Sequence, residues 1–163
     1  MTAAIIAFTR RGAALAARLA EELSTAVSRT EVLTSLAAVT AERKRRSSTP
    51  SALPQLRARA RAPFTWAAKA WGTADALIFV GAAGIAVRAI APHVRDKFTD
   101  PAVVSVDEAG RFVIPLLSGH VGGANELALK VAALTGSQAA VSTATDVNGL
   151  FAVDVWARER DMV

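Results

Sequence analysis

Blocks of apolar and polar residues along the first half of the chain predict alternating strands and helices. Residues 4–8 and 76–80 are uninterrupted apolar runs, as expected of strands buried on both faces of a parallel sheet. Leucines repeat at four-residue spacing within residues 11–23, which predicts an amphipathic helix that Thr9 can cap. Residues 63–72 show helical spacing again, with a glycine at the end.

The second half continues this alternation and adds a hairpin. A helix is predicted from Ile85 to about His93, after a glycine-containing turn. Residues 102–107 and 112–116 form two strand-like runs separated by four residues that include glycine, which is hairpin spacing. Residues 122–136 predict another helix, and residues 139–142 a last strand.

These elements predict one α/β domain spanning residues 1–163. We expect three layers (α/β/α) around a mostly parallel sheet with one hairpin addition. Residues 37–62 are predicted to be an exposed basic connection, and short strands are candidates at 32–33 and 154–157.

Composition narrows the class of protein. The 163 residues are 52% hydrophobic and include no cysteine, which excludes disulfides, thiolate metal sites and cysteine nucleophiles and suits a reducing cytoplasm. The first arginines follow the N-terminal apolar run instead of preceding it, unlike a secretory signal. No apolar stretch approaches the roughly 20 residues of a membrane span, so no membrane association is expected.

The net charge of +5 is concentrated in one segment. Residues 37–72 hold eight basic residues and one acid (+7), so the remainder of the chain sums to −2. This segment is either a solvated basic loop or a collar for a polyanionic ligand. Nucleic acid is the weaker interpretation, because Phe64, Trp66 and Trp71 lie at helical spacing and not in a stacking motif.

Two glycine-rich junctions between a strand and a helix are candidate binding sites. In Gly81–Arg88, backbone N–H groups would face a ligand at a helix N-terminus, although a plain tight turn explains the pattern as well. In Ser118–Glu126, three glycines surround His120, which is either a general base or a structural hydrogen-bonding residue. Ser118 lacks the nucleophile-elbow pattern and is better read as a cap or ligand donor.

Polar residues after other predicted strands complete the set of candidates. Thr143, Thr145 and Asp146 follow the last strand, at a position where open α/β sheets commonly bind ligands, and capping is the alternative. Asp107 and Glu108 follow an earlier strand. With only two histidines and no ligand spacing, no protein metal site is expected.

Several of these segments together resemble one known family. Residues 80–92, 96–97, 100–104, 116–128 and 143–146 are similar to the N-terminal domain of the cobalamin-biosynthesis protein CbiG family, and residues 154–157 also fit. The resemblance implies a cobalt-precorrin-5A hydrolase, which opens the ring-A δ-lactone and releases acetaldehyde. Cobalt arrives within the substrate, so no separate cofactor is implied.

Combined with this resemblance, the candidate residues divide into two roles. The expected catalytic residues are His120, Glu126 and Asp146. The expected substrate-binding residues are Gly81, Gly84, Arg88, Lys97, Ser118, Gly119, Gly122, Gly123, Asn125, Thr143 and Thr145. Arg88, Lys97 and the basic segment would pair with substrate carboxylates, and the N–H groups of the three loop glycines would hold an oxyanion.

Family members continue into a C-terminal domain, whereas this sequence ends at Val163. We therefore expect a separate C-terminal domain or neighbouring pathway enzymes as partners. The alternative function is a non-catalytic tetrapyrrole-binding domain or partner subunit of the same pathway.

Overall fold

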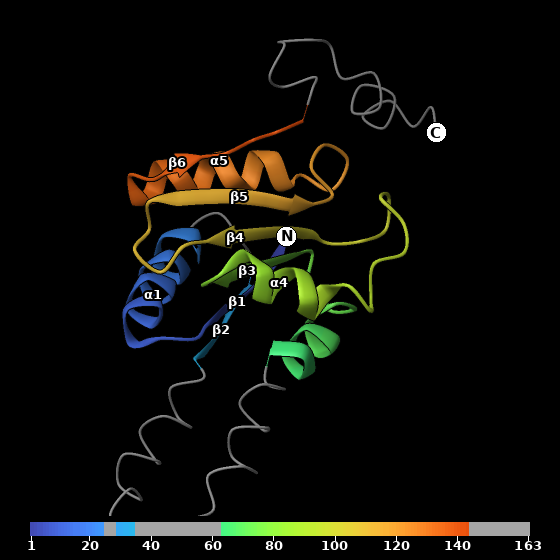
Figure 1. The fold of residues 1–163 in the computed structure, drawn as a ribbon, viewed down its shortest axis with the longest axis horizontal. Helices are drawn as coiled ribbons and strands as arrows, with labels where there is room; N and C mark the ends of the chain where they lie inside the picture. Colours follow the sequence, from blue (N-terminus) through green and yellow to red (C-terminus); the bar gives the residue numbers. More distant parts are fainter. Residues whose placement is uncertain (25–28, 35–62, 144–163) are drawn as a thin grey trace, which may run out of the picture.

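The protein is built on one six-stranded sheet (Figure 1), seen in a computed structural model that describes residues 1–24, 29–34 and 63–143. Across the sheet the strand order is β2-β1-β3-β4-β5-β6. The strands are β1 Thr2–Ala7, β2 Arg29–Thr34, β3 Ala76–Val80, β4 Ala102–Val106, β5 Phe112–Leu117 and β6 Gln138–Ala139. The predicted α/β class is confirmed.

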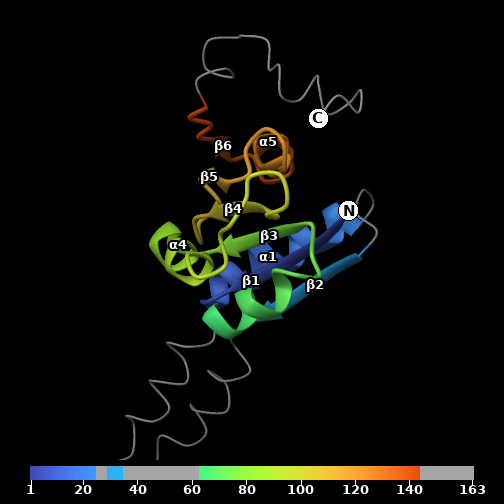
Figure 2. The ribbon, with the colours of Figure 1, turned by 90° about the vertical axis from the view of Figure 1, so that its right-hand side faces the viewer.

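Helices cover both faces of the sheet. They are α1 (Arg10–Ser24), α4 (Ala83–Ile90), α5 (Ala124–Thr135) and the helical residues 63–70. Helices α1 and α5 share one apolar cluster with the sheet, and α4 and residues 63–70 share the other. Figure 2 shows α4 and α5 on opposite sides of β4. The three predicted layers are therefore present.

The apolar strands of the sheet are buried on both faces, as their sequences predicted. Every residue of β3 and β4 is buried, and Phe79 lies edge-on to Trp66 with ring centroids 5.1 Å apart. Helix α1 adds Leu19 and Leu23 to the opposite cluster, which confirms its amphipathic reading. Thr9 caps α1, because its Oγ1 accepts a hydrogen bond from the N–H of Gly12 at 3.0 Å.

The predicted hairpin is confirmed, and it determines at which edge of the sheet α5 begins. Strands β2, β1, β3 and β4 are parallel, β5 is antiparallel to β4, and β6 is parallel to β5. We call the side where the four parallel strands begin the amino edge, and the side where they end the carboxyl edge. Because β5 runs backwards, it ends at the amino edge, and α5 begins there (Figure 1).

Several element boundaries differ from the prediction: the strand predicted at 32–33 spans Arg29–Thr34, for example, and two other differences have a clear cause. Helix α4 ends at Ile90 and not at His93, because Pro92 has no N–H to continue the helical hydrogen bonds. Strand β6 has two residues, Gln138 and Ala139, instead of the predicted 139–142. The N–H of Ala140 still reaches the carbonyl of Val113 at 2.8 Å. The next bond of this parallel ladder would require an N–H on Pro115, which proline lacks.

Two predictions lie outside the described residues, namely the basic connection at 37–62 and the strand at 154–157. No helix in the described part of the chain is long and apolar enough to cross a membrane.

Candidate functional site

The segment of residues 118–123 joins β5 to α5 and folds back on itself at the amino edge. Ser118 takes a left-handed backbone conformation with φ 57°. The N–H groups of Ala124 and Asn125 then donate to the carbonyls of Ser118 and Gly119, at 3.1 and 3.0 Å. These bonds hold the loop against the first turn of α5 and fix the position of His120, which is half-buried within it.

Two glycines of this loop are required by its own packing. A Cβ on Gly122 would collide with Ser118, lying 2.9 Å from its carbonyl oxygen. A Cβ on Gly119 would lie 2.8 Å from Oδ1 of Asn125. Gly123 has φ 80° and forms the N-cap of α5, a conformation that favours glycine.

Ser118 and Asn125 are buried, and their side chains bind other parts of the protein. The Ser118 hydroxyl donates to the carbonyl of Asp100 at 3.0 Å, and Nδ2 of Asn125 donates to Oγ1 of Thr143 at 2.9 Å. These bonds do not make Ser118 a helix cap, because its hydroxyl donates to a carbonyl and the N-cap of α5 is Gly123, without a side-chain capping bond. The second bond makes Asn125 the link between α5 and the residues after β6. Thr143 follows β6, which runs parallel to β5 and therefore leads to the amino edge. The prediction that Thr143 lies at the carboxyl edge, where open α/β sheets bind ligands, is therefore wrong.

The loop of residues 91–101 lies beside this one at the amino edge and carries Lys97. Asp100 is buried, and its Oδ2 accepts hydrogen bonds from the N–H groups of Arg95 and Asp96 at 2.8 and 3.0 Å. Its carbonyl is the acceptor of the Ser118 hydroxyl described above. Sequence reasoning did not single out Asp100 as a site residue. The available signal was an aspartate four residues after Asp96, separated from the next strand by one proline.

Arg88 and Glu126 are exposed on the helices next to these loops. Arg88 lies in the last turn of α4, and Glu126 in the first turn of α5. A positive charge at the C-terminus of a helix and a negative charge at its N-terminus both interact favourably with the helix dipole. Each charge therefore has a structural role that requires no ligand.

Gly81 and Gly84 lie at the opposite, carboxyl edge. A Cβ on Gly81 would lie 2.6 Å from the ring of Phe8, so this glycine is required by packing. Gly84 is exposed in the first turn of α4, and a Cβ there would meet nothing within 4 Å. The structure thus divides the predicted site residues between two edges of the sheet.

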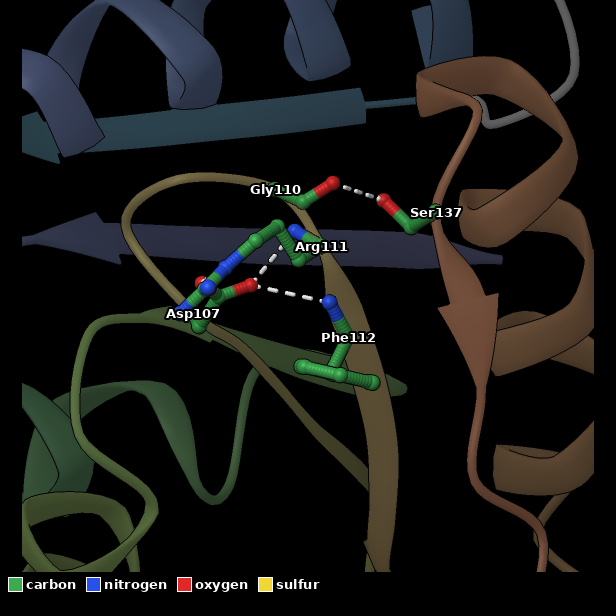
Figure 3. A network of polar contacts seen from close by, with 5 residues as sticks. All are labelled: Asp107, Gly110, Arg111, Phe112 and Ser137. Atoms are coloured by element: carbon green, nitrogen blue, oxygen red, sulfur yellow. Dashed lines mark hydrogen bonds and ion pairs between the residues drawn. The ribbon is translucent and has the colours of Figure 1, made fainter.

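Asp107 is engaged in the hairpin turn at the carboxyl edge (Figure 3). Its Oδ1 accepts hydrogen bonds from the N–H groups of Arg111 and Phe112 at 2.6 and 2.8 Å, and its Oδ2 lies 3.4 Å from Nε of Arg111. Desolvation acts to raise the pKa of this carboxyl. The two backbone hydrogen bonds and the Arg111 side chain outweigh it and hold the pKa below its ordinary value of 3.8.

Of the remaining predicted residues, Thr145, Asp146 and residues 37–62 of the basic segment lie outside the described residues, whereas Lys69 is exposed on the helical residues 63–70. Among the residues that are described, no three histidine or carboxylate side chains gather as a metal site would require. The group that the structure brings together is therefore at the amino edge. It comprises Lys97, Ser118, Gly119, His120, Gly122, Gly123, Asn125, Glu126 and Thr143.

Comparison with known proteins identifies relatives of this chain. The chain is 56% identical over 91 residues to the cobalt-precorrin-5A hydrolase of Salmonella typhimurium, a match covering 56% of this chain and 26% of that protein. It is 48% identical over 82 residues to the enzyme of the same name from Priestia megaterium, covering 50% of this chain and 22% of the relative. The matches thus span about a quarter of the length of these relatives.

A solved structure shares the fold. It is described as a cobalamin biosynthesis protein G homolog from Sulfolobus solfataricus, with a TM-score of 0.62 and 22% sequence identity over 86% of this chain and 36% of that one. The family model for the N-terminal region of cobalamin synthesis protein G matches residues 65–146, half of the chain. This chain therefore belongs to the cobalamin synthesis G N-terminal family.

Proposed function

We propose that this chain takes part in the hydrolysis of cobalt-precorrin-5A, in which the ring-A δ-lactone is opened and a two-carbon unit leaves as acetaldehyde. The observation that carries the proposal is the 56% identity over 91 residues to a cobalt-precorrin-5A hydrolase. The family match, residues 65–146, includes both amino-edge loops, 91–101 and 118–123.

His120 is the residue best suited to move protons in this reaction. When water adds to the lactone carbonyl, an imidazole accepts the proton of the water and then donates it to the oxygen that leaves the ring. The fold supports this role because hydrogen bonds fix the backbone on both sides of His120, so the ring is presented from a rigid loop.

The backbone of the same loop offers a place for the developing negative charge. The N–H of Gly123 is already used, since it donates to the carbonyl of His120 at 3.1 Å. The N–H groups of Gly119 and Gly122 donate to no acceptor within the described ranges. The oxyanion role expected for all three glycines therefore narrows to these two.

The test is acetaldehyde release from cobalt-precorrin-5A, with the chain alone and with the C-terminal portion of a full-length relative added. His120→Ala should reduce release by at least about 100-fold, the usual contribution of a general acid–base residue. His93→Gln is the matched control, because the chain has only two histidines and the His93 ring packs on Trp71 with centroids 5.7 Å apart.

The outcomes separate catalysis from binding. Release that depends on His120 and not on His93 supports the proposal. Substrate binding with no release under either condition would contradict it and favour a non-catalytic tetrapyrrole-binding domain. Equal release by the wild type and by His120→Ala would remove His120 from the mechanism.

A further inference from the structure

Two apolar side chains are exposed on the amino-edge loop between α4 and β4. Val94 is 43% exposed and Phe98 is 50% exposed. Two exposed basic residues, Arg95 and Lys97, lie between them along the loop, on either side of the exposed Asp96. We call these four residues the ledge. Scattered exposed apolar residues are common, but here two lie within five residues and beside two cations.

The loop that carries the ledge is held in place by internal hydrogen bonds. Asp100 accepts from the N–H groups of Arg95 and Asp96, and Oδ1 of Asp96 accepts from the N–H of Phe98 at 2.7 Å. The N–H of Asp100 in turn donates to the carbonyl of Asp96 at 2.8 Å. A loop held by these bonds presents Phe98 to solvent, which gives a preorganised contact surface.

The two acids of the loop, Asp96 and Asp100, keep their negative charge but are held by backbone N–H groups. Among the described residues, neither Arg95 nor Lys97 takes part in an ion pair with these acids or with any other group. Nζ of Lys97 lies 4.8 Å from the centre of the Phe98 ring, which keeps a positive charge next to an apolar surface. Such a surface fits a ligand that has a flat apolar body and acidic substituents.

The ledge is also joined to the loop that carries His120. The Ser118 hydroxyl donates to the carbonyl of Asp100, and both residues are buried. This bond connects the base of the ledge with the start of the 118–123 loop. A ligand bound on the ledge would therefore lie at the same edge of the sheet as His120.

We propose that Val94, Arg95, Lys97 and Phe98 form a binding surface for a tetrapyrrole macrocycle with several carboxylates. Phe98 and Val94 contact the ring, and Arg95 and Lys97 pair with its carboxylates. The identity of the ligand rests on the proposed function, whereas the surface itself rests on exposure, charge and the hydrogen bonds of the loop.

The experiment is a spectroscopic titration of the whole chain with two ligands, uroporphyrin and cobalt-precorrin-5A. Uroporphyrin is an octacarboxylic tetrapyrrole without the lactone, so its binding is measured independently of hydrolysis. Phe98→Ala and the double variant Arg95→Gln/Lys97→Gln should each raise the Kd by about tenfold or more. The charge variant should also reduce the dependence of Kd on salt.

Phe112→Ala provides a matched control at the carboxyl edge. Phe112 is 45% exposed, and the Arg111 guanidinium lies 5.8 Å from its ring centre, so it has a similar neighbour in a different place. Its Kd should equal that of the wild type. Thermal unfolding of each variant checks that the fold is retained, which these exposed positions favour.

The named outcomes decide between the proposal and its competitors. Weakened binding by the ledge variants alone supports it. Unchanged Kd in those variants, or no binding of either ligand by the wild type, would overturn it. So would concentration-dependent self-association that Phe98→Ala abolishes, because the ledge would then be a protein contact. Acetaldehyde release, measured in parallel, judges the proposed function separately.

Discussion

The two edges of the sheet each have a glycine-rich junction between a strand and a helix, but their glycines serve different purposes. At the amino edge, Gly119 lies against the side chain of Asn125 in α5, and Gly122 lies against Ser118 of its own loop. At the carboxyl edge, Gly81 makes room for the ring of Phe8, whereas Gly84 faces open space. Close packing therefore accounts for Gly81, Gly119 and Gly122, whereas Gly84 at the carboxyl edge has no such constraint.

The comparison also shows how a single antiparallel strand relocates a candidate site. In open α/β sheets, ligands usually bind at the carboxyl ends of the parallel strands. Here the loop with His120 follows β5, which runs opposite to β4, and so lies at the amino edge. Its neighbours there are the ledge, Asp100 and Thr143, while Gly81 and Gly84 remain at the other edge.

The strongest test of this contrast is Gly122→Ala. The new methyl group would lie 2.9 Å from the Ser118 carbonyl oxygen, a backbone atom that cannot rotate away. We expect a loss of about 2–3 kcal/mol in the free energy of unfolding, the upper part of the range for overpacked sites. Chemical denaturation measures this value. A loss of a few tenths of a kcal/mol would mean that the loop adapts easily and is not tightly packed.

Ser118→Ala tests the link between the two amino-edge loops. Removing the hydroxyl leaves the buried Asp100 carbonyl without this donor, and the new side chain still requires φ near 57°. We expect a loss of about 1–2 kcal/mol by denaturation. Thr135→Ala is a control for loss of a hydroxyl at the other end of α5, since Oγ1 of Thr135 donates to the Val131 carbonyl of its own helix at 2.8 Å and also contacts the Ser137 hydroxyl.

If the link positions the ledge, Ser118→Ala should also weaken tetrapyrrole binding, which Thr135→Ala should not. An unchanged Kd would show that the bond contributes to stability alone.

Asp107→Ala tests the carboxyl edge, where the polar contacts are local to the hairpin. The variant loses two backbone hydrogen bonds, so we expect about 1 kcal/mol of destabilisation at pH 7. Because the folded pKa of Asp107 is lowered, its stabilisation is present above the ordinary value of 3.8 and is lost as the pH falls through the folded value.

The difference between wild type and Asp107→Ala should therefore shrink below about pH 4 in denaturation experiments. Glu108→Ala is the control, since Glu108 is exposed in the same turn. A difference that is constant from pH 7 to pH 3 would contradict the lowered pKa.

The sequence predicted which segments form strands and helices better than it predicted how these elements pair and where they place the site residues. Apolar runs predicted β1 and β3, and the glycine between two β-rich runs predicted the hairpin, because both signals are local. The short β6 depended on its register against Pro115, which no local pattern reveals. The placement of Ser118 and Gly81 at opposite edges of the sheet likewise follows from the antiparallel pairing of β4 with β5.

The same distinction applies to the candidate site. His120 and its glycines were found because they are contiguous in the sequence. The bonds from Ser118 to Asp100 and from Asn125 to Thr143 each join residues 18 positions apart, so they appear only after folding. The exposure of Phe98 could not be predicted from the sequence either, because the pattern of residues does not distinguish an apolar side chain in the core from one on the surface of a loop.

Gly84→Ala completes the comparison with the smallest expected effect and the opposite sign. Nothing lies within 4 Å of the new methyl group, and alanine is favoured over glycine inside a helix, so we expect about 0.5–1 kcal/mol of stabilisation. Denaturation of Gly84→Ala and Gly122→Ala side by side measures the contrast directly. Acetaldehyde release adds a functional reading, because a substrate close to the Gly84 backbone would be hindered by the methyl group. If release is unchanged while stability rises, Gly84 has no part in substrate binding, and Gly81 is left as the predicted binding glycine at the carboxyl edge.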